Sequence, residues 1–82
     1  MIKLKFINLI RNYIEDNEFK IKILKNKVSI INYLLIKEIE SDLIIIKYED
    51  GLVYIKGEKL VITKLMNDEV LITGVINNIE LR

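Results

Sequence analysis

The sequence contains no cysteine and no histidine. No disulfide can form, and the common zinc and transition-metal sites are excluded because they draw their ligands from these two side chains. A thiol or imidazole catalytic pair is excluded for the same reason, so carboxylates and lysines remain as the candidate catalytic groups. We therefore predict a protein that is not an enzyme and that uses no metal and no cofactor.

The sequence also lacks a large excess of either charge. Thirteen basic side chains face twelve acidic ones, for a net charge of +1, whereas nucleic-acid-binding domains normally carry a strong basic excess. The balance is uneven: residues 1–28 hold seven basic and three acidic side chains, and residues 29–82 hold six and nine. Tyr33, Tyr48 and Tyr54 lie in the acidic part, which favours core or rim packing over a stacking platform for bases. We predict no nucleic-acid partner.

No uninterrupted run of 18 apolar residues occurs, so the sequence predicts no membrane-spanning helix. Near the N-terminus, basic and amide side chains interrupt the apolar ones where a signal peptide needs an unbroken apolar stretch. These two features together predict a cytoplasmic location.

Proline and alanine are absent, and 18 of the 82 residues are isoleucine. The length allows one domain, which we place over residues 1–82. β-branched side chains fit the pleated surface of a sheet, so the composition favours strands over helices. The lack of proline also leaves sheet edges without a residue that often blocks further pairing.

Residues 1–16 predict an amphipathic helix. At about 100° per residue, its apolar side chains fall on one broad face and its charged and amide side chains fall opposite. Phe6, Ile10 and Tyr13 on the apolar face are candidates for partner binding. We expect this face to cover the helix's own sheet, because so small a domain has few apolar side chains to spare. Two alternatives stay open, which are an anionic membrane surface and a partner chain.

From residue 19 the apolar period changes to that of strands, separated by turn residues. Asp50-Gly51 predicts a tight hairpin turn with a positive φ at Gly51. Gly57 marks a predicted turn, and Gly74 a bulge or bend. The predicted strands cover residues 19–23, 28–36, 43–48, 52–56, 60–64, 70–73 and 75–81.

The charged segment 37–42 should be exposed. Its acidic side chains Glu38, Glu40 and Asp42 alternate, which is typical of a solvated surface rather than a catalytic pair. The Glu49-Asp50-Gly51 segment lacks the several spaced oxygen ligands of a calcium loop, so we interpret it as a turn.

The fold class predicted from this pattern is mainly β (α+β). The N-terminal helix precedes a six- to seven-stranded antiparallel meander, rolled into a small barrel or sandwich. Several strands are apolar on both faces, for example residues 43–46 and 60–62, so another element or another chain must cover one of the faces. A homo-oligomer is one way to supply that cover.

The pattern from residue 19 onward resembles the YabP/YqfC family of sporulation proteins. The most specific part is G-x-x-L-x-I followed by I-x-G-x-I-x-x-I, which match residues 57–62 and 72–79. Where the family has an acidic residue before Asn32, this sequence has Ile31. The further matching stretches are IKIL at 21–24, VSIINY at 28–33, residues 43–47, DGLVYI at 50–55, and the ends of the closing segment 69–81.

The resemblance places a YabP/YqfC-like β domain at residues 19–82. It implies a structural protein of endospore formation that acts in assembly at the spore envelope or coat, by protein–protein interaction. It implies a protein partner, with a sporulation membrane protein as one candidate, and a place at the forespore or spore envelope surface. A peripheral membrane adaptor, held by the basic helix, is the alternative. The family supplies no catalytic residues to assign.

Overall fold

The computed structural model describes residues 18–82, and within that range the chain forms six β-strands and no helix. The prediction of a mainly-β domain is confirmed. The predicted helix at residues 1–16, with the candidates Phe6, Ile10 and Tyr13, lies outside the described residues. The strands are β1 (Lys20–Leu24), β2 (Lys27–Ile31), β3 (Leu35–Ile39), β4 (Leu43–Tyr48), β5 (Gly51–Leu65) and β6 (Glu69–Leu81).

The strands form one antiparallel sheet in the order β1-β2-β6-β5-β4-β3. From β3 to β6 each strand pairs with the next one along the chain, which is the predicted meander. The β1–β2 hairpin departs from it, because β2 pairs with β6 and the chain then passes to the far end of the sheet order to begin β3. The prediction of one continuous meander was wrong for this hairpin.

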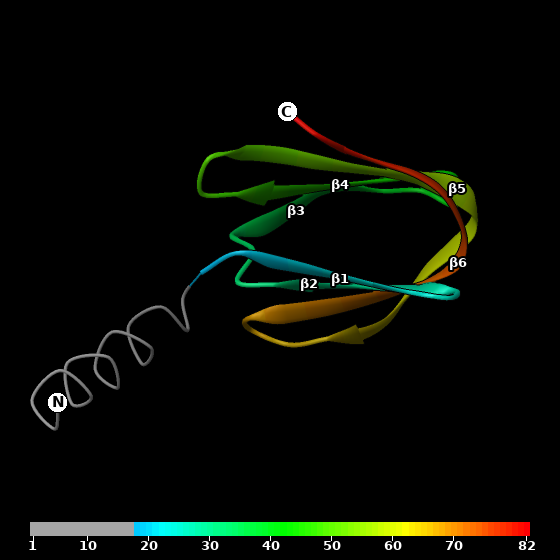
Figure 1. Ribbon diagram of the computed structural model, residues 1–82, viewed down its shortest axis with the longest axis horizontal. Helices are drawn as coiled ribbons and strands as arrows, with labels where there is room; N and C mark the ends of the chain where they lie inside the picture. Colours follow the sequence, from blue (N-terminus) through cyan, green and yellow to red (C-terminus); the bar gives the residue numbers. More distant parts are fainter. Residues whose placement is uncertain (1–17) are drawn as a thin grey trace, which may run out of the picture.

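The sheet folds over into a two-layered sandwich because β5 and β6 bend together near their middles (Figure 1). We define the first layer as β1, β2, residues 69–73 of β6 and residues 61–65 of β5. The second layer holds β3, β4, residues 51–56 of β5 and residues 75–81 of β6. The long β5–β6 hairpin therefore contributes two strand segments to each layer.

Three residues permit the bend: Gly57, which leaves room for a close backbone contact, and Gly74 and Lys59, which have a positive φ. A Cβ at Gly57 would overlap the carbonyl oxygen of Val75, and Gly74 has a φ of 135° that L side chains rarely adopt. Lys59 has a φ of 53°, and the β5–β6 register shifts on both sides of it. The predicted turn at Gly57 was wrong, since residues 52–56 and 60–64 belong to one bent strand. Gly74, predicted as a bulge or bend, lies at the same corner.

Gly51 serves a different purpose from the one predicted. Glu49 and Asp50 form the turn, and Gly51 is the first residue of β5, opposite Tyr48. Its φ is not in the left-handed region, so the predicted positive φ was wrong. Instead, a Cβ at Gly51 would overlap the carbonyl oxygen of Arg82, whose backbone exchanges hydrogen bonds of 2.7 and 2.8 Å with Leu52. The glycine allows β6 to lie against the start of β5.

The second predicted strand, residues 28–36, is divided at Asn32. This residue has a φ of 63°, which asparagine tolerates better than most residues. The chain leaves the first layer there and enters the second layer at β3, which occupies part of the segment predicted to be a charged surface. Lys37, Glu38 and Ile39 of β3 are exposed, as that prediction required.

The core lies between the two layers and is almost entirely aliphatic. On β4, β5 and β6 the buried residues alternate, as they do where one face of a sheet is covered, whereas β2 buries Val28, Ser29 and Ile30 in succession. No buried side-chain nitrogen or oxygen within residues 18–82 lacks a hydrogen-bond partner. The buried hydrophobic residues are Val28, Ile30, Ile44, Ile46, Val53, Ile55, Leu60, Val70 and Ile72.

Candidate functional site

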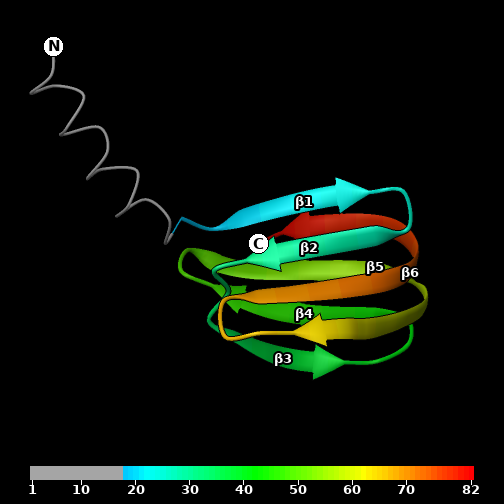
Figure 2. The ribbon, with the colours of Figure 1, turned by 90° about the horizontal axis from the view of Figure 1, so that it is seen from below.

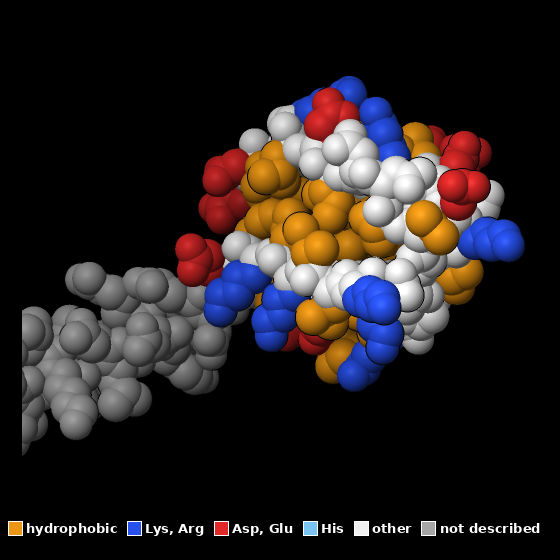
Figure 3. Space-filling model, turned by 45° about the vertical axis from the view of Figure 1, so that its right-hand side comes forward, with side chains coloured by type: hydrophobic (Ala, Val, Ile, Leu, Met, Phe, Trp, Pro, Cys, Tyr) orange, Lys and Arg blue, Asp and Glu red, His pale blue; other side chains and the backbone are white. Residues whose placement is uncertain are grey.

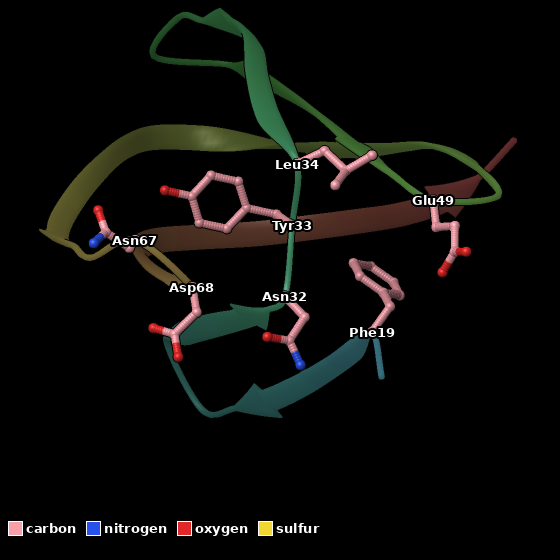
Figure 4. Close-up of a pocket in the computed structure, with 7 residues that line it drawn as sticks. All are labelled: Phe19, Asn32, Tyr33, Leu34, Glu49, Asn67 and Asp68. Carbon is pink, nitrogen blue, oxygen red and sulfur yellow. The ribbon is translucent and has the colours of Figure 1, made fainter. Parts of the chain in front are cut away.

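A pocket of about 440 Å³ opens at the end of the sandwich where the β2–β3 connection crosses between the layers. Figure 4 shows its residues arriving from four separate segments. Phe19 precedes β1, and Glu49 belongs to the β4–β5 turn. The β2–β3 connection and the β5–β6 turn supply the others, which are Asn32, Tyr33, Leu34, Asn67 and Asp68.

Hydrogen bonds fix the β2–β3 connection against its neighbours. The backbone N–H of Asn32 donates to the carbonyl oxygen of Asp68, and its side-chain amide donates to the carbonyl oxygen of Glu18 at 2.7 Å. The Tyr33 hydroxyl donates to the carbonyl oxygen of Met66 at 2.7 Å. The pocket's polar groups therefore hold the connection in place.

The chemistry that this pocket offers is limited. Its carboxylates, Glu49 and Asp68, lie at opposite ends of the pocket in Figure 4, whereas a general acid and base must both reach one substrate bond. The ring of Phe19 stacks on that of Tyr48 with the centroids 4.1 Å apart and the planes at 19°. The arrangement stabilises the open end of the sandwich and provides no catalytic pair.

The long sides of the sandwich are more distinctive than its pocket. Within the described residues, β1 and β3 each pair with one strand only, and residues 75–81 of β6 and 61–65 of β5 also pair on one edge only. Figure 2 shows β1 and the last part of β6 along one side of the molecule, and β3 with the end of β5 along the opposite side. We call these the first side and the second side.

Apolar side chains of the first side point into the sandwich and yet remain exposed. Each of them lies opposite a buried core residue on the neighbouring strand, and opposite residues share one face of a sheet. Ile23 lies opposite Val28 and is 66% exposed, and Leu81 lies opposite Val53 and is 58% exposed. Figure 3 shows a hydrophobic hollow between the two layers, with both basic and acidic side chains around its rim.

The second side repeats this arrangement. Ile39 of β3 lies opposite the buried Ile44 and is 58% exposed, and Leu65 of β5 lies opposite the buried Val70 and is 61% exposed. On both sides the hydrophobic interior therefore extends to the outermost strand without being covered by described residues.

The two sides differ in charge. The β1–β2 hairpin carries four exposed lysines and no acidic residue between positions 20 and 27, namely Lys20, Lys22, Lys25 and Lys27. At β3, the negative charge of Glu38 raises the pKa of Glu40 above its usual value, with a smaller contribution from Asp42. These three carboxylates were predicted to form a solvated segment, and they lie exposed at the end of β3.

The residues singled out in the sequence fall into two groups. Asp50, Gly51, Gly57 and Gly74 all shape the sandwich, at one hairpin turn and one bend, and they do not converge on a pocket. The open sides were not identified from the sequence, although strands that are apolar on both faces, such as residues 43–46 and 60–62, indicated apolar surface in need of cover. The opposite charges of residues 20–27 and 38–42 were a usable signal once both segments were known to be edge strands.

Within residues 18–82, no group of three or more acidic side chains is arranged to hold a metal ion. No helix among these residues is long and apolar enough to cross a membrane.

These features define a small β-sandwich domain whose outer strand edges are not covered by any residue of the range 18–82. The family model of the YabP family matches residues 15–82, and the chain belongs to this family. The resemblance noted in the sequence is thereby confirmed, and the family gives the protein a sporulation-related role. No match to a curated protein or to a solved structure was found.

Proposed function

We propose that the protein is a non-enzymatic assembly protein of endospore formation, acting at the spore envelope or coat by binding other protein chains. The observation that carries this proposal is the pair of open sides, where strand edges and inward-facing apolar side chains lie uncovered among the described residues. An uncovered strand edge offers main-chain hydrogen bonds to an added strand, and the apolar row beside it offers pockets for that strand's side chains.

The experiment replaces Ile23 or Ile39 by Asp in the chromosomal gene of the spore-forming host. Both side chains are exposed in the single chain, so the variants should fold, but a carboxylate would become buried wherever a partner covers the side. We expect a loss of heat-resistant spores. Leu24→Asp is the matched control, because Leu24 is 56% exposed on β1 but points to the outer face of the layer, and it should sporulate like the parent. Ile23 and Ile39 variants that accumulate and sporulate normally would contradict the proposal.

A second candidate function is that of a peripheral membrane adaptor. The four lysines of the β1–β2 hairpin favour it, since they begin four residues after the segment 1–16 and would add to the attraction of its Lys3, Lys5 and Arg11 for anionic lipids. Flotation with phosphatidylserine-containing and neutral vesicles tests it. Binding to the anionic vesicles that is lost on replacing Lys3, Lys5 and Arg11 by Gln would support the adaptor, and no binding to either vesicle would exclude it.

A further inference from the structure

We infer that the protein assembles side to side with further copies of itself, the first side of one copy docking on the second side of the next, to give an open-ended two-layered β-sandwich. This inference rests on the proposed assembly function and names its partner as a second copy of the chain.

The geometry of the two sides is compatible with such stacking. β1 belongs to the first layer and β3 to the second, and Figure 2 shows the two strands running in the same direction on opposite sides of the molecule. Consider a rotation of the second copy by 180° about the axis that runs from the first side to the second side, parallel to the layers and perpendicular to the strands. This rotation reverses the direction of the strands and exchanges the two layers, while each side stays where it was. After that turn, β3 of the second copy continues the layer of β1 and runs antiparallel to it.

The same half-turn also pairs the other two edges. Residues 61–65 of β5 in the second copy then continue the layer of residues 75–81 of β6 in the first copy, again antiparallel, since both segments run in one direction within a copy (Figure 2). Both layers are thereby extended at once. Because one side meets a different side, the contact is heterologous and leaves a free side at each end for further copies.

Residues 20–22 of one copy and 38–40 of the next match in an antiparallel register, which begins after the β-bulge between Ile36 and Glu38. When Ile21 lies opposite Ile39 of the next copy, Lys22 lies opposite Glu38 and Lys20 lies opposite Glu40. The apolar pair faces the interior, because Ile21 and Ile39 each lie opposite a buried residue of their own sheet, Ile30 and Ile44. Opposite charges directly across two strands stabilise the pairing.

Pairing of like sides is disfavoured by the same charges. Two copies joined through β1 would bring Lys20 and Lys22 of both chains together, and like charges directly opposite are destabilising. In the head-to-tail arrangement, by contrast, the lysines approach the carboxylates of Glu38 and Glu40, which repel one another within a single chain. A second copy of the chain therefore supplies an apolar cover for both sides and, at the β1 and β3 edges, side chains of opposite charge.

The test is sedimentation velocity of the full-length chain over a wide concentration range at low salt. We expect the parent to form species that grow beyond a dimer of the 9.7 kDa chain as concentration rises. Lys20→Glu/Lys22→Glu and Glu38→Lys/Glu40→Lys should each remain monomeric, because the β1 and β3 positions that face each other then carry like charges. An equimolar mixture of the two variants should assemble again, since the acidic β1 edge of one then meets the basic β3 edge of the other.

Lys27→Glu/Lys59→Glu is the matched control, as it makes the same change in net charge at two exposed lysines, on the interior strand β2 and at the bend of β5, which lie outside all four edge segments. This variant should assemble like the parent. A parent that remains monomeric at every concentration, a parent that stops at a dimer, or reversed variants that do not rescue each other would overturn the inference. Loss of spores in the Ile23 and Ile39 variants together with a monomeric parent would retain the proposed function and assign the sides to a different chain.

Discussion

Gly74 lies against the backbone of Lys59 at the corner of the sandwich, so close that a Cβ at position 74 would lie 2.6 Å from the Lys59 carbonyl oxygen. Gly74 has a φ of 135° and Lys59 a φ of 53°. The bends of β6 and β5 therefore depend on each other, since each strand occupies the space that a side chain on the other would need. Two turns add a hydrogen bond each, from Gly57 N–H to the Asp42 carbonyl at 3.1 Å and from Gly74 N–H to the Asn26 carbonyl at 3.2 Å.

Replacement of Gly74 by Ala should therefore destabilise the fold. The new methyl group forces both an unfavourable φ and a contact with backbone atoms that cannot rotate away, and we expect a cost on the order of 2–4 kcal/mol in the free energy of unfolding. Urea denaturation measures it. Val75→Ala, at a neighbouring exposed position, should change stability by about 0.5 kcal/mol or less. Equal stability of the two variants would show that the corner tolerates a Cβ.

Much of this fold follows from the alternation of apolar residues along the chain. The pattern correctly predicted strands around residues 19–23, 43–48 and 70–81, because alternating burial on a covered sheet leaves a period of two in the sequence. It could not show that residues 52–56 and 60–64 form one bent strand. Gly57-Glu58-Lys59 has the composition of a turn, and the contact that makes it a bend comes from Val75, far along the chain.

The open sides were harder to predict for a related reason. Ile23 and Ile39 have the same local pattern as the buried Ile30 and Ile44, and only the order of strands decides which of them lie at an edge. That order depends on the pairing of β2 with β6, which joins segments about 40 residues apart. Charge was the better local signal, since the lysines of 20–27 and the acids of 38–42 both mark exposed strands.

Gly51→Ala should also destabilise the protein, through contact rather than through backbone conformation. The new Cβ would push against the carbonyl oxygen of Arg82 and disturb the two hydrogen bonds between Arg82 and Leu52. We expect a cost of about 1–3 kcal/mol in thermal or urea unfolding. Removing Arg82 should make the Gly51→Ala change nearly neutral in a double-mutant cycle. A cost that persists without Arg82 would instead indicate that the β4–β5 turn itself requires glycine.

The carboxylate of Glu80 should make stability depend on pH in the acidic range. The pKa of Glu80 is lowered, first by its hydrogen bond with Lys56 at 3.2 Å and then by the charge of Arg82, which also lies over the Tyr54 ring. A lowered pKa in the folded state means that this stabilisation is present above the ordinary Glu pKa and is lost as pH falls through the lowered value. Chemical denaturation between about pH 6 and pH 3 should show that the free energy of unfolding falls less steeply with decreasing pH for Glu80→Gln than for the parent.

Because the Glu80 side chain is 39% exposed, salt should weaken this effect, and the pH dependence should flatten at high ionic strength. Glu58→Gln provides the matched control, since Glu58 is an exposed carboxylate of the bend with no ion pair among the described residues. The idea fails if Glu80→Gln and the parent lose stability in parallel as the pH falls.

The apolar face predicted for residues 1–16 is the alternative to a second copy as the cover for the open sides. If copies cover one another, Phe6→Asp/Ile10→Asp should leave both the thermal unfolding and the self-association of the full-length chain nearly unchanged. If this face instead covers its own sheet, the same variant should unfold at a lower temperature or aggregate. The two added carboxylates would prevent residues 1–16 from packing against the apolar hollow and would leave it exposed to water. Lys5→Asp/Asn8→Asp, on the predicted polar face, controls for added charge near the N-terminus. A variant that keeps its stability and assembly but no longer floats with anionic vesicles would assign Phe6, Ile10 and Tyr13 to membrane contact.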